Sequence, residues 1–225
     1  MAKKVNETRT SIEELNESLS GIEKKVEDNK KMIVWVLAAI VAIAVAILGY
    51  VNLIQEPNME KAMEEIAKAD MDYTMGEDSI ALSEYMAVAD NYSNDASNRA
   101  GLNAAIILYK QGKYEEAINY LKKYDGAGAL VGPASQALLG DCYVNLGKYD
   151  DAVKYFNKAI SLAGDNELYT PLFILKKATV LRVQEKYADE AKALQVIKDK
   201  YPTFINGYQV DVDKYLERAK AQAGK

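Results

Sequence analysis

A seven-residue motif that recurs 35 residues later limits this chain to a repeat architecture. Its two copies are Gly112-Lys-Tyr114-Glu-Glu-Ala117-Ile and Gly147-Lys-Tyr149-Asp-Asp-Ala152-Val. A weaker first copy, over residues 59–93, has Gly76 five residues before Ala81. A weaker last copy, over residues 171–202, aligns Tyr187 and Ala191 with the motif, with one extra residue and no glycine. Units of this length, with small and apolar residues at fixed positions, predict antiparallel helix pairs stacked on one another.

The copy around Gly147 shows what each residue type contributes. Gly140 and Ala152 are small enough for the two helices of a hairpin to approach closely, and Gly147 permits the tight turn between them. The pattern resembles the tetratricopeptide repeat (TPR), a helix–turn–helix unit. We predict an all-α fold, a TPR solenoid of about four repeats closed by a capping helix over residues 210–221, because terminal repeats must cover the open end of a stack.

An uninterrupted apolar run precedes the repeats. Residues 32–55 contain no charged side chain. As a helix they would extend about 36 Å, enough to cross a hydrocarbon core of about 30 Å. The run is longer than the apolar part of a cleaved signal peptide, and it lacks the polar face of an ordinary core helix. We therefore predict a transmembrane signal anchor in contact with membrane lipid.

The lysines around this run are distributed asymmetrically. Lys24, Lys25, Lys30 and Lys31 precede it, whereas Glu56 and Glu60 follow it closely with Lys61 and Lys68. The positive-inside rule places the lysine-rich side in the cytoplasm. The predicted organisation is a cytoplasmic helical arm at 1–31, the anchor at 32–55, and a solenoid on the opposite side at 56–225. In a bacterial inner membrane, that opposite side is the periplasm.

The arm itself carries a heptad pattern. Apolar residues recur every seven positions, with two more placed three residues later: Val5, Ile12, Leu19 and Val26, then Leu15 and Ile22. Such a seam is typical of two-stranded coiled coils. It indicates a homo-oligomer through residues 5–26, or packing on a partner helix. The alternative is an amphipathic helix that is solvated or lies on the membrane.

The first helices of stacked hairpins commonly line a groove that binds a partner segment. By position in the repeats, the groove residues should be Arg99, Leu102, Ile106, Tyr109 and Lys110 in the second repeat, Ala137, Asp141 and Val144 in the third, and Leu172 and Leu175 in the fourth. The set is mixed but substantially apolar. Some of its apolar members could instead pack beneath the C-terminal helix, since burial is the usual fate of apolar helix residues.

Composition excludes several functional classes. The chain has no histidine and a single cysteine, which removes Ser–His and Cys–His nucleophile pairs. Its net charge of -5 argues against nucleic-acid binding, which normally requires a basic face. No metal-ligand cluster or nucleotide-binding loop is recognisable. We expect a protein that is not an enzyme and that requires no cofactor or metal.

The order of elements also resembles the ancillary SecYEG translocon subunit (YfgM-like) family. The resemblance rests on a lysine-flanked anchor, a first hairpin that ends with Asp90-Asn-Tyr-Ser93, two good repeats, and Asp199-Lys-Tyr-Pro202 before the final helix. It implies a scaffold in the inner membrane that binds the SecYEG translocon, a membrane-anchored periplasmic chaperone and exported polypeptides. The alternative is an adaptor of another envelope machine, such as outer-membrane assembly, cell division or a secretion system.

Overall fold

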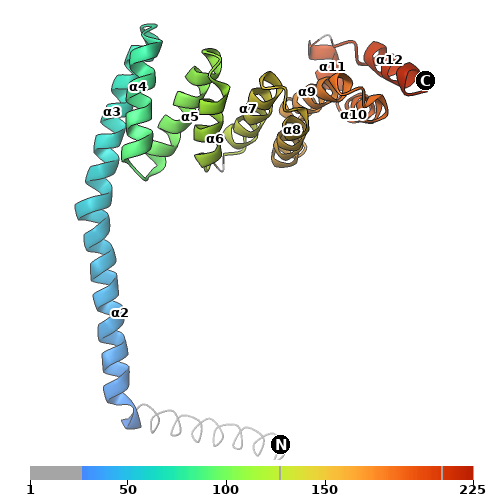
Figure 1. Cartoon of the computed structure of the whole chain (residues 1–225). Helices are drawn as coiled ribbons and strands as arrows, with labels where there is room; N and C mark the ends of the chain where they lie inside the picture. The colour runs from blue at the N-terminus through green and yellow to red at the C-terminus, as the bar shows by residue number, and fades with distance from the viewer. Residues whose placement is uncertain (1–26, 127, 209, 225) are drawn as a thin grey trace, which may run out of the picture. The chain divides into compact units, whose positions relative to one another are not determined.

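A computed structural model describes residues 27–126, 128–208 and 210–224, and in these ranges the fold is all-α, as predicted (Figure 1). The chain divides into two compact units, residues 1–58 and 59–225. The predicted heptad seam at 5–26 lies outside the described residues. The helices are α2 (Lys30–Tyr50), the π-helix η1 (Val51–Gln55), α3 (Glu56–Thr74), α4 (Asp78–Asn91), α5 (Asp95–Lys110), α6 (Tyr114–Lys123), α7 (Val131–Asn145), α8 (Tyr149–Ala163), α9 (Tyr169–Val183), α10 (Tyr187–Lys200), α11 (Pro202–Tyr208) and α12 (Val212–Ala223).

The apolar run forms helix throughout. The helical segment Lys30–Thr74 contains an 18-residue window with a mean hydropathy of 2.9, and none of that window is buried. It is long and apolar enough to cross a membrane. Within this segment α2 is followed directly by the π-helix η1, where the Asn52 side-chain amide donates to the Leu48 carbonyl oxygen at 3.0 Å. The sequence did not predict this change of helix type.

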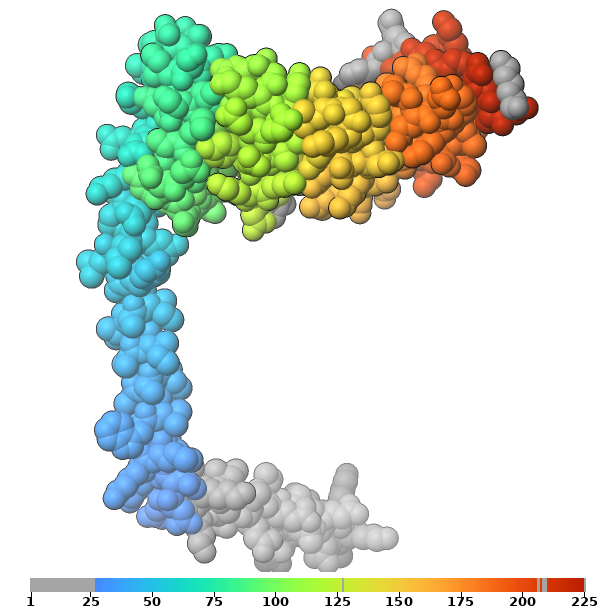
Figure 2. Space-filling model, in the orientation of Figure 1, coloured from blue at the N-terminus to red at the C-terminus, as the bar shows by residue number. Residues whose placement is uncertain are grey.

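The second unit is built from helical hairpins that follow one another along the chain. The pairs are α3/α4, α5/α6, α7/α8 and α9/α10. Each hairpin also packs on the next, through α4 with α5, α6 with α7 and α8 with α9. Figure 2 shows these hairpins in direct contact, from the green α5 to the orange α10. The predicted array of about four repeats is therefore confirmed.

The tight turns correct the alignment of the fourth repeat. Three turns use a glycine in the left-handed region, and Glu185 takes that conformation in the fourth: Gly76 (φ 84°), Gly112 (φ 77°), Gly147 (φ 69°) and Glu185 (φ 59°). Counting five residues from Glu185 leads to Glu190, so the alignment on Ala191 with an extra residue is wrong by one position. The sequence alone did not reveal this alignment, because the turn position that is glycine in the other repeats is Glu185 in the fourth.

The hairpin α7/α8 depends on the missing side chain of Gly140. A Cβ atom built there would lie 2.6 Å from Cε1 of Phe156, whose ring is almost completely buried. The two helices can approach this closely because nothing but hydrogen projects from Gly140 toward the ring. The predicted role of this glycine is confirmed.

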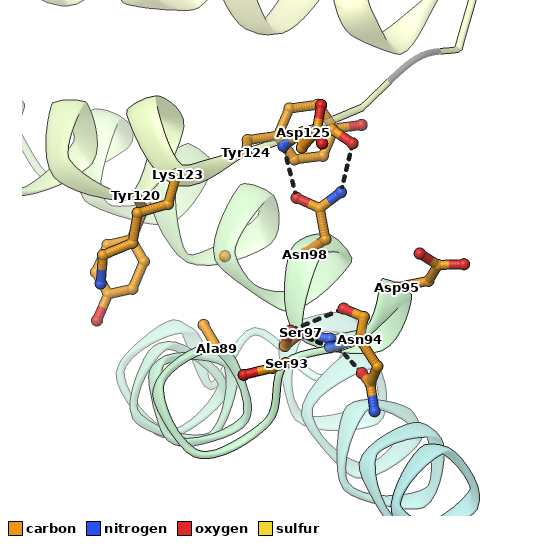
Figure 3. Close-up of a pocket in the computed structure, with 11 residues that line it drawn as sticks. Ala89, Ser93, Asn94, Asp95, Ser97, Asn98, Tyr120, Lys123, Tyr124 and Asp125 are labelled. Atoms are coloured by element: carbon orange, nitrogen blue, oxygen red, sulfur yellow. Dashed lines mark hydrogen bonds between the residues drawn. The ribbon is translucent and has the colours of Figure 1, made fainter. Parts of the chain in front are cut away.

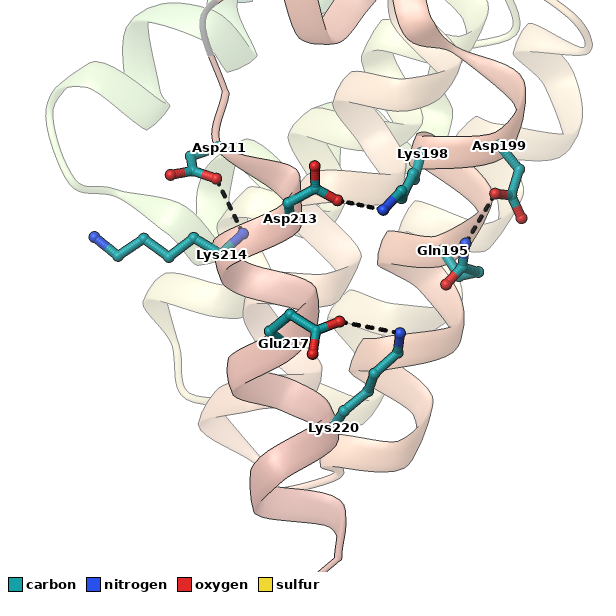
Figure 4. A network of polar contacts seen from close by, with 8 residues as sticks. All are labelled: Gln195, Lys198, Asp199, Asp211, Asp213, Lys214, Glu217 and Lys220. Atoms are coloured by element: carbon teal, nitrogen blue, oxygen red, sulfur yellow. Dashed lines mark hydrogen bonds and ion pairs between the residues drawn. The ribbon is translucent and has the colours of Figure 1, made fainter.

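Helix α12 covers the last hairpin, near the predicted position. Its Val212, Leu216 and Ala219 are buried against α10, in an apolar cluster that also contains Leu194 and Ile197. At the rim, Lys198 of α10 forms an ion pair with Asp213 of α12 at 2.6 Å (Figure 4). A larger cluster, from Ala62 to Val180, fills the preceding hairpins. The short helix α11 before α12 was not predicted.

A pair of glycine substitutions tests the close approach in α7/α8. Gly140→Ala should lower the free energy of unfolding by about 1–3 kcal/mol, because the added Cβ would lie 2.6 Å from the almost completely buried Phe156 ring and force it to shift. Gly101 on α5 is the matched control, since its added Cβ would meet atoms at 3.7 Å, an ordinary contact distance. Gly101→Ala should be neutral or stabilising by up to about 1 kcal/mol. Chemical denaturation of the full chain in detergent measures both, and equal losses would contradict the interpretation.

Glu185 provides a second test of the repeat geometry. Glu185→Gly should raise the thermal midpoint, with a gain of about 0.5–1 kcal/mol, because a left-handed conformation strains any residue with a Cβ. Glu185→Ala removes the same charge but keeps the strain, so it should give no comparable gain. A gain of equal size in the alanine variant would assign the effect to charge.

Candidate functional site

The first helices α5, α7 and α9 together form a surface that we call the first-helix face. An apolar cavity of about 210 Å³ opens on it. The cavity is lined from three helices and one preceding loop, by Leu102, Ile106, Leu130, Val131, Ala134, Ser135, Leu138 and Tyr169. The hydroxyl of Ser135 donates to the Gly132 carbonyl oxygen at 2.8 Å, so it is already satisfied. The cavity therefore offers apolar contacts to a ligand.

A second cavity of about 250 Å³ lies beside the first, toward α3. Its lining comprises Asp70, Tyr73, Tyr85, Asn103, Ile106 and Ile107. Ile106 lines both cavities, so its side chain lies between them. A substitution of Ile106 would therefore change the lining of both cavities at once.

Polar contacts between successive first helices border the second cavity. Asp70 of α3 forms an ion pair with Arg99 of α5 and accepts a hydrogen bond from the Tyr85 hydroxyl. Burial of the ring, with the nearby Asp70 carboxylate, raises the pKa of Tyr85. Lys110 donates to the Tyr73 hydroxyl, and its Nζ lies 4.9 Å from the centroid of that ring. These contacts tie α3 to α5.

The corresponding link between α7 and α9 is an ion pair. Lys176 Nζ lies 2.8 Å from both carboxylate oxygens of Asp141. Burial raises the pKa of Asp141, and the hydrogen bonds and charge of Lys176 oppose that rise. Tyr109 of α5 is near the same carboxylate, and its pKa is raised first by burial and then by the Asp141 charge. Both carboxylate oxygens of Asp141 are therefore already paired with Lys176 of the neighbouring first helix.

The predicted groove residues occupy three kinds of position. Arg99 and Lys110 are exposed, and Ala137 is buried, with 4% of its surface accessible. The others are half-buried: Leu102, Ile106, Tyr109, Asp141, Val144, Leu172 and Leu175. Leu102 and Ile106 meet in the apolar cavity. Leu175 instead packs in the cluster that contains α12, the alternative that the sequence left open.

Sequence reasoning missed several residues of the first-helix face. Leu130, Val131, Leu138 and Tyr169 line the apolar cavity, and Lys176 pairs with Asp141. A strict 35-residue shift from Leu102 leads to the buried Ala137, whereas the half-buried neighbour Leu138 lines the cavity. The available signal was the apolar pair Leu130-Val131, two residues before Pro133, because large apolar side chains exposed together mark an interaction site.

A polar cavity of about 320 Å³ lies elsewhere, between the α4–α5 turn and the end of α6 (Figure 3). The Asn98 side chain donates to the Asp125 carbonyl oxygen and accepts from the Asp125 amide, both at 2.9 Å. Asn94 and Ser97 cap the start of α5. These groups satisfy one another, so the contacts fasten the connector after α6 to α5.

The described residues show no site for metal or thiol chemistry. Among them, no group of three or more His, Cys, Asp or Glu side chains could hold a metal ion. Cys142 is buried, and burial raises the pKa of its thiol to about 12. A thiol with this pKa stays protonated at neutral pH, so it is a poor nucleophile.

Comparisons with known proteins identify the repeats. Models of the tetratricopeptide repeat match residues 99–124 and 134–166. No curated protein matches the sequence. The fold is similar to that of MamA, with 17% identity, a TM-score of 0.56, and coverage of 73% of this chain and 89% of MamA. It is also similar to YrrB, described as a TPR protein with an unusual peptide-binding site, with 17% identity, a TM-score of 0.53, and coverage of 74% and 89%.

A third similar structure is a putative kinesin light chain of Podosopora anserina with TPR-like repeats. It shares 14% identity with a TM-score of 0.52, and the match covers 72% of this chain and 95% of that one. Identities this low show the fold alone. Two segments of the chain thus match the tetratricopeptide repeat, and they lie within an array that has the fold of a TPR protein.

The two partners of the α7–α9 ion pair should respond unequally to substitution. Lys176→Met leaves the Asp141 carboxylate half-buried without its partner and should cost about 1–3 kcal/mol of stability. Asp141→Asn removes the charge that burial disfavours and should cost less than about 1 kcal/mol. Urea denaturation measures the difference.

The loss in Lys176→Met should also depend on pH. Without the lysine, the pKa of Asp141 in the folded state lies further above its unfolded value, so the folded state binds a proton more tightly. Stability of this variant relative to the parent should therefore recover as the pH falls through that raised pKa. A constant difference across the acidic range would show that Asp141 is not the group responsible.

Proposed function

We propose that this protein is a non-enzymatic, membrane-anchored scaffold that binds polypeptide segments through the first-helix face. The observation that carries the proposal is the apolar cavity bounded by Leu102, Ile106 and Leu138. The Ser135 hydroxyl in its lining already has a hydrogen-bond partner in the Gly132 carbonyl oxygen. Apolar concave surfaces with a few polar groups at the rim are the usual form of binding sites. The peptide-binding site named for YrrB supports the same use of a similar fold.

The proposed organisation follows from the first 60 residues. Residues 32–55 anchor the protein in the bacterial inner membrane, with the arm at 1–31 in the cytoplasm and the solenoid at 56–225 in the periplasm. The length and hydropathy of the helix support the anchor. The excess of lysines before the apolar run supports the direction of insertion. The heptads at 5–26 would let two copies associate on the cytoplasmic side.

The proposed place of action is the Sec translocon. The resemblance to the ancillary SecYEG subunit family supports this proposal, in which the first-helix face receives exported polypeptides or a membrane-anchored periplasmic chaperone. An exported chain is unfolded and exposes apolar side chains. Such side chains would gain from burial in the cavity between α5 and α7, at about 25 cal/mol per Å² of apolar surface removed from water.

Site-specific crosslinking in cells tests this function. A photoreactive residue in place of Tyr109, which lies on α5 one turn after Ile106, should capture translocon subunits, a periplasmic chaperone or exported polypeptides. The matched control is the same probe at Lys158, an exposed residue of the second helix α8. Ile106→Asp should reduce capture at position 109 by about 10-fold or more, since burial of the aspartate opposes docking.

The outcomes separate the parts of the proposal. Capture of another envelope complex without translocon subunits would contradict the Sec assignment and favour the alternative adaptor role. Equal capture from positions 109 and 158 would contradict the first-helix face. The thermal midpoint of Ile106→Asp must stay near that of the parent, because a loss of folding would mean that Ile106 is a core residue.

A further inference from the structure

Ile106 separates two neighbouring cavities, and each is large enough for one side chain. The apolar cavity between α5 and α7 has a volume of about 210 Å³, and the second cavity, toward α3, has a volume of about 250 Å³. For comparison, an apolar cavity of about 150 Å³ accommodates a benzene ring. Since Ile106 lines both cavities, they are one side chain apart, and a single polypeptide segment can reach both.

The apolar cavity opens to solvent beside exposed aliphatic side chains. Leu130 is 52% exposed and Val131 is 45% exposed, and both line the cavity. The half-buried Leu102 and Leu138 continue the same lining. The hydroxyl of Ser135 already donates to a backbone carbonyl oxygen. A side chain that enters this cavity therefore gains most by being aliphatic.

The second cavity combines an apolar wall with a carboxylate that a ligand can reach. Its lining includes Ile106, Ile107 and Tyr85. Asp70 also lines it, and 37% of the Asp70 side chain is exposed. This carboxylate accepts from the Tyr85 hydroxyl and pairs with Arg99, but a carboxylate offers about four acceptor sites. Asp70 can therefore accept a further hydrogen bond from a side chain in the cavity.

These features favour a tyrosine or a tryptophan in the second cavity. Either side chain has a ring for the apolar wall and one hydrogen-bond donor for Asp70. Phenylalanine lacks the donor. A lysine or arginine would bring a second cation to a carboxylate whose charge Arg99 already balances, and an acidic side chain would be repelled by that carboxylate.

The first hairpin is far more acidic than the hairpins that follow it. The hairpin α3/α4 contains ten acidic residues and two lysines, a net charge of -8, whereas α5/α6 contains three acidic and five basic residues, a net charge of +2. The second cavity lies on the α3 side of Ile106, so a segment that spans both cavities meets a negative potential at one end. A basic residue at that end, next to the aromatic residue, complements this potential.

We propose that the first-helix face recognises an extended polypeptide segment with an aliphatic residue and, two residues away, a tyrosine or tryptophan flanked by a basic residue. The aliphatic side chain enters the apolar cavity, and the aromatic side chain enters the second cavity and donates to Asp70. Residues two apart in an extended chain project to the same side and lie about 6.6–6.8 Å apart, which suits a wall one side chain thick. This inference rests on the proposed polypeptide-binding function and specifies its ligand.

Binding of short labelled peptides to the full chain in lipid nanodiscs tests the proposal, with empty nanodiscs as the background. The reference peptide is serine-rich, with leucine and tyrosine two residues apart and a lysine beyond the tyrosine. It is made in both chain directions, because a groove favours one of them. In the better direction it should bind at least about 10-fold more tightly than peptides in which leucine and tyrosine are adjacent or three residues apart. Those spacings place the two side chains on opposite sides of the extended chain, so only one is buried.

Two further changes in the peptide examine the second cavity and the acidic hairpin. Phenylalanine in place of tyrosine should weaken binding by about 5-fold or more, because the hydrogen bond to Asp70 is lost. Moving the lysine to the leucine end should weaken binding by about 3-fold at low salt, and this difference should decrease as salt is added.

Substitutions in the protein assign each side chain to its cavity. Ala134 lines the apolar cavity and is exposed, so Ala134→Phe should fill the cavity without disturbing the core. This variant should bind the reference peptide about 10-fold more weakly and no longer distinguish leucine from serine at the aliphatic position. Ala87→Phe introduces the same side chain at an exposed alanine of the second helix α4 and should change nothing. Asp70→Asn should at least halve the preference for tyrosine over phenylalanine, because a neutral acceptor binds the donor more weakly.

Three results would overturn the proposal. The first is equal binding of the peptides with different spacings, the second is equal binding of the tyrosine and phenylalanine peptides, and the third is the absence of saturable binding by every peptide. If the probe at position 109 still captures polypeptides in cells more efficiently than the probe at position 158, the scaffold function stands and only its ligand class is wrong. If that difference is also absent, the proposed function fails as well.

Discussion

The close approach of the two helices within a hairpin is the constraint on which the array depends. It requires a small residue where the helices meet, and Gly140 against Phe156 shows how little space remains. The fully buried alanines of the second helices, Ala117 in α6 and Ala152 in α8, meet the same requirement for a small residue. Once each hairpin has this thickness, its two outer faces lie at a fixed distance, and the next hairpin can repeat the same packing. The surface lined by the first helices is a consequence of that repetition.

Polar contacts then link successive first helices across this surface. The Asp70–Arg99 pair joins α3 to α5, and the Asp141–Lys176 pair joins α7 to α9. Between them, α5 and α7 meet through Leu102, Ile106 and Leu138, where the apolar cavity lies. The charged side chains are occupied by one another on either side, so the apolar segment between them is the part of the face left available to a partner.

The repeat period determined most of what could be predicted. The sequence predicted the hairpins and the final helix from repeated apolar and small residues. It predicted the turns at Gly112 and Gly147 because glycine readily takes the left-handed conformation that these turns require. The fourth repeat was misaligned because Glu185 and Glu190 stand where the other units have glycine and alanine. The cavity residues were harder to predict, since Leu138 lies one residue after the position that the 35-residue period indicates, and Tyr169 is the first residue of α9.

The two apolar clusters of the array have a consequence for how it would open. They share the half-buried Ile160 and Leu172, whereas their fully buried members are separate. The segment from α10 to α12 should therefore exchange its amide hydrogens faster than the middle hairpins, as a local unfolding unit with its own free energy. A chain pulled from its C-terminus would lose this segment first, and the hairpins that line the apolar cavity would remain folded.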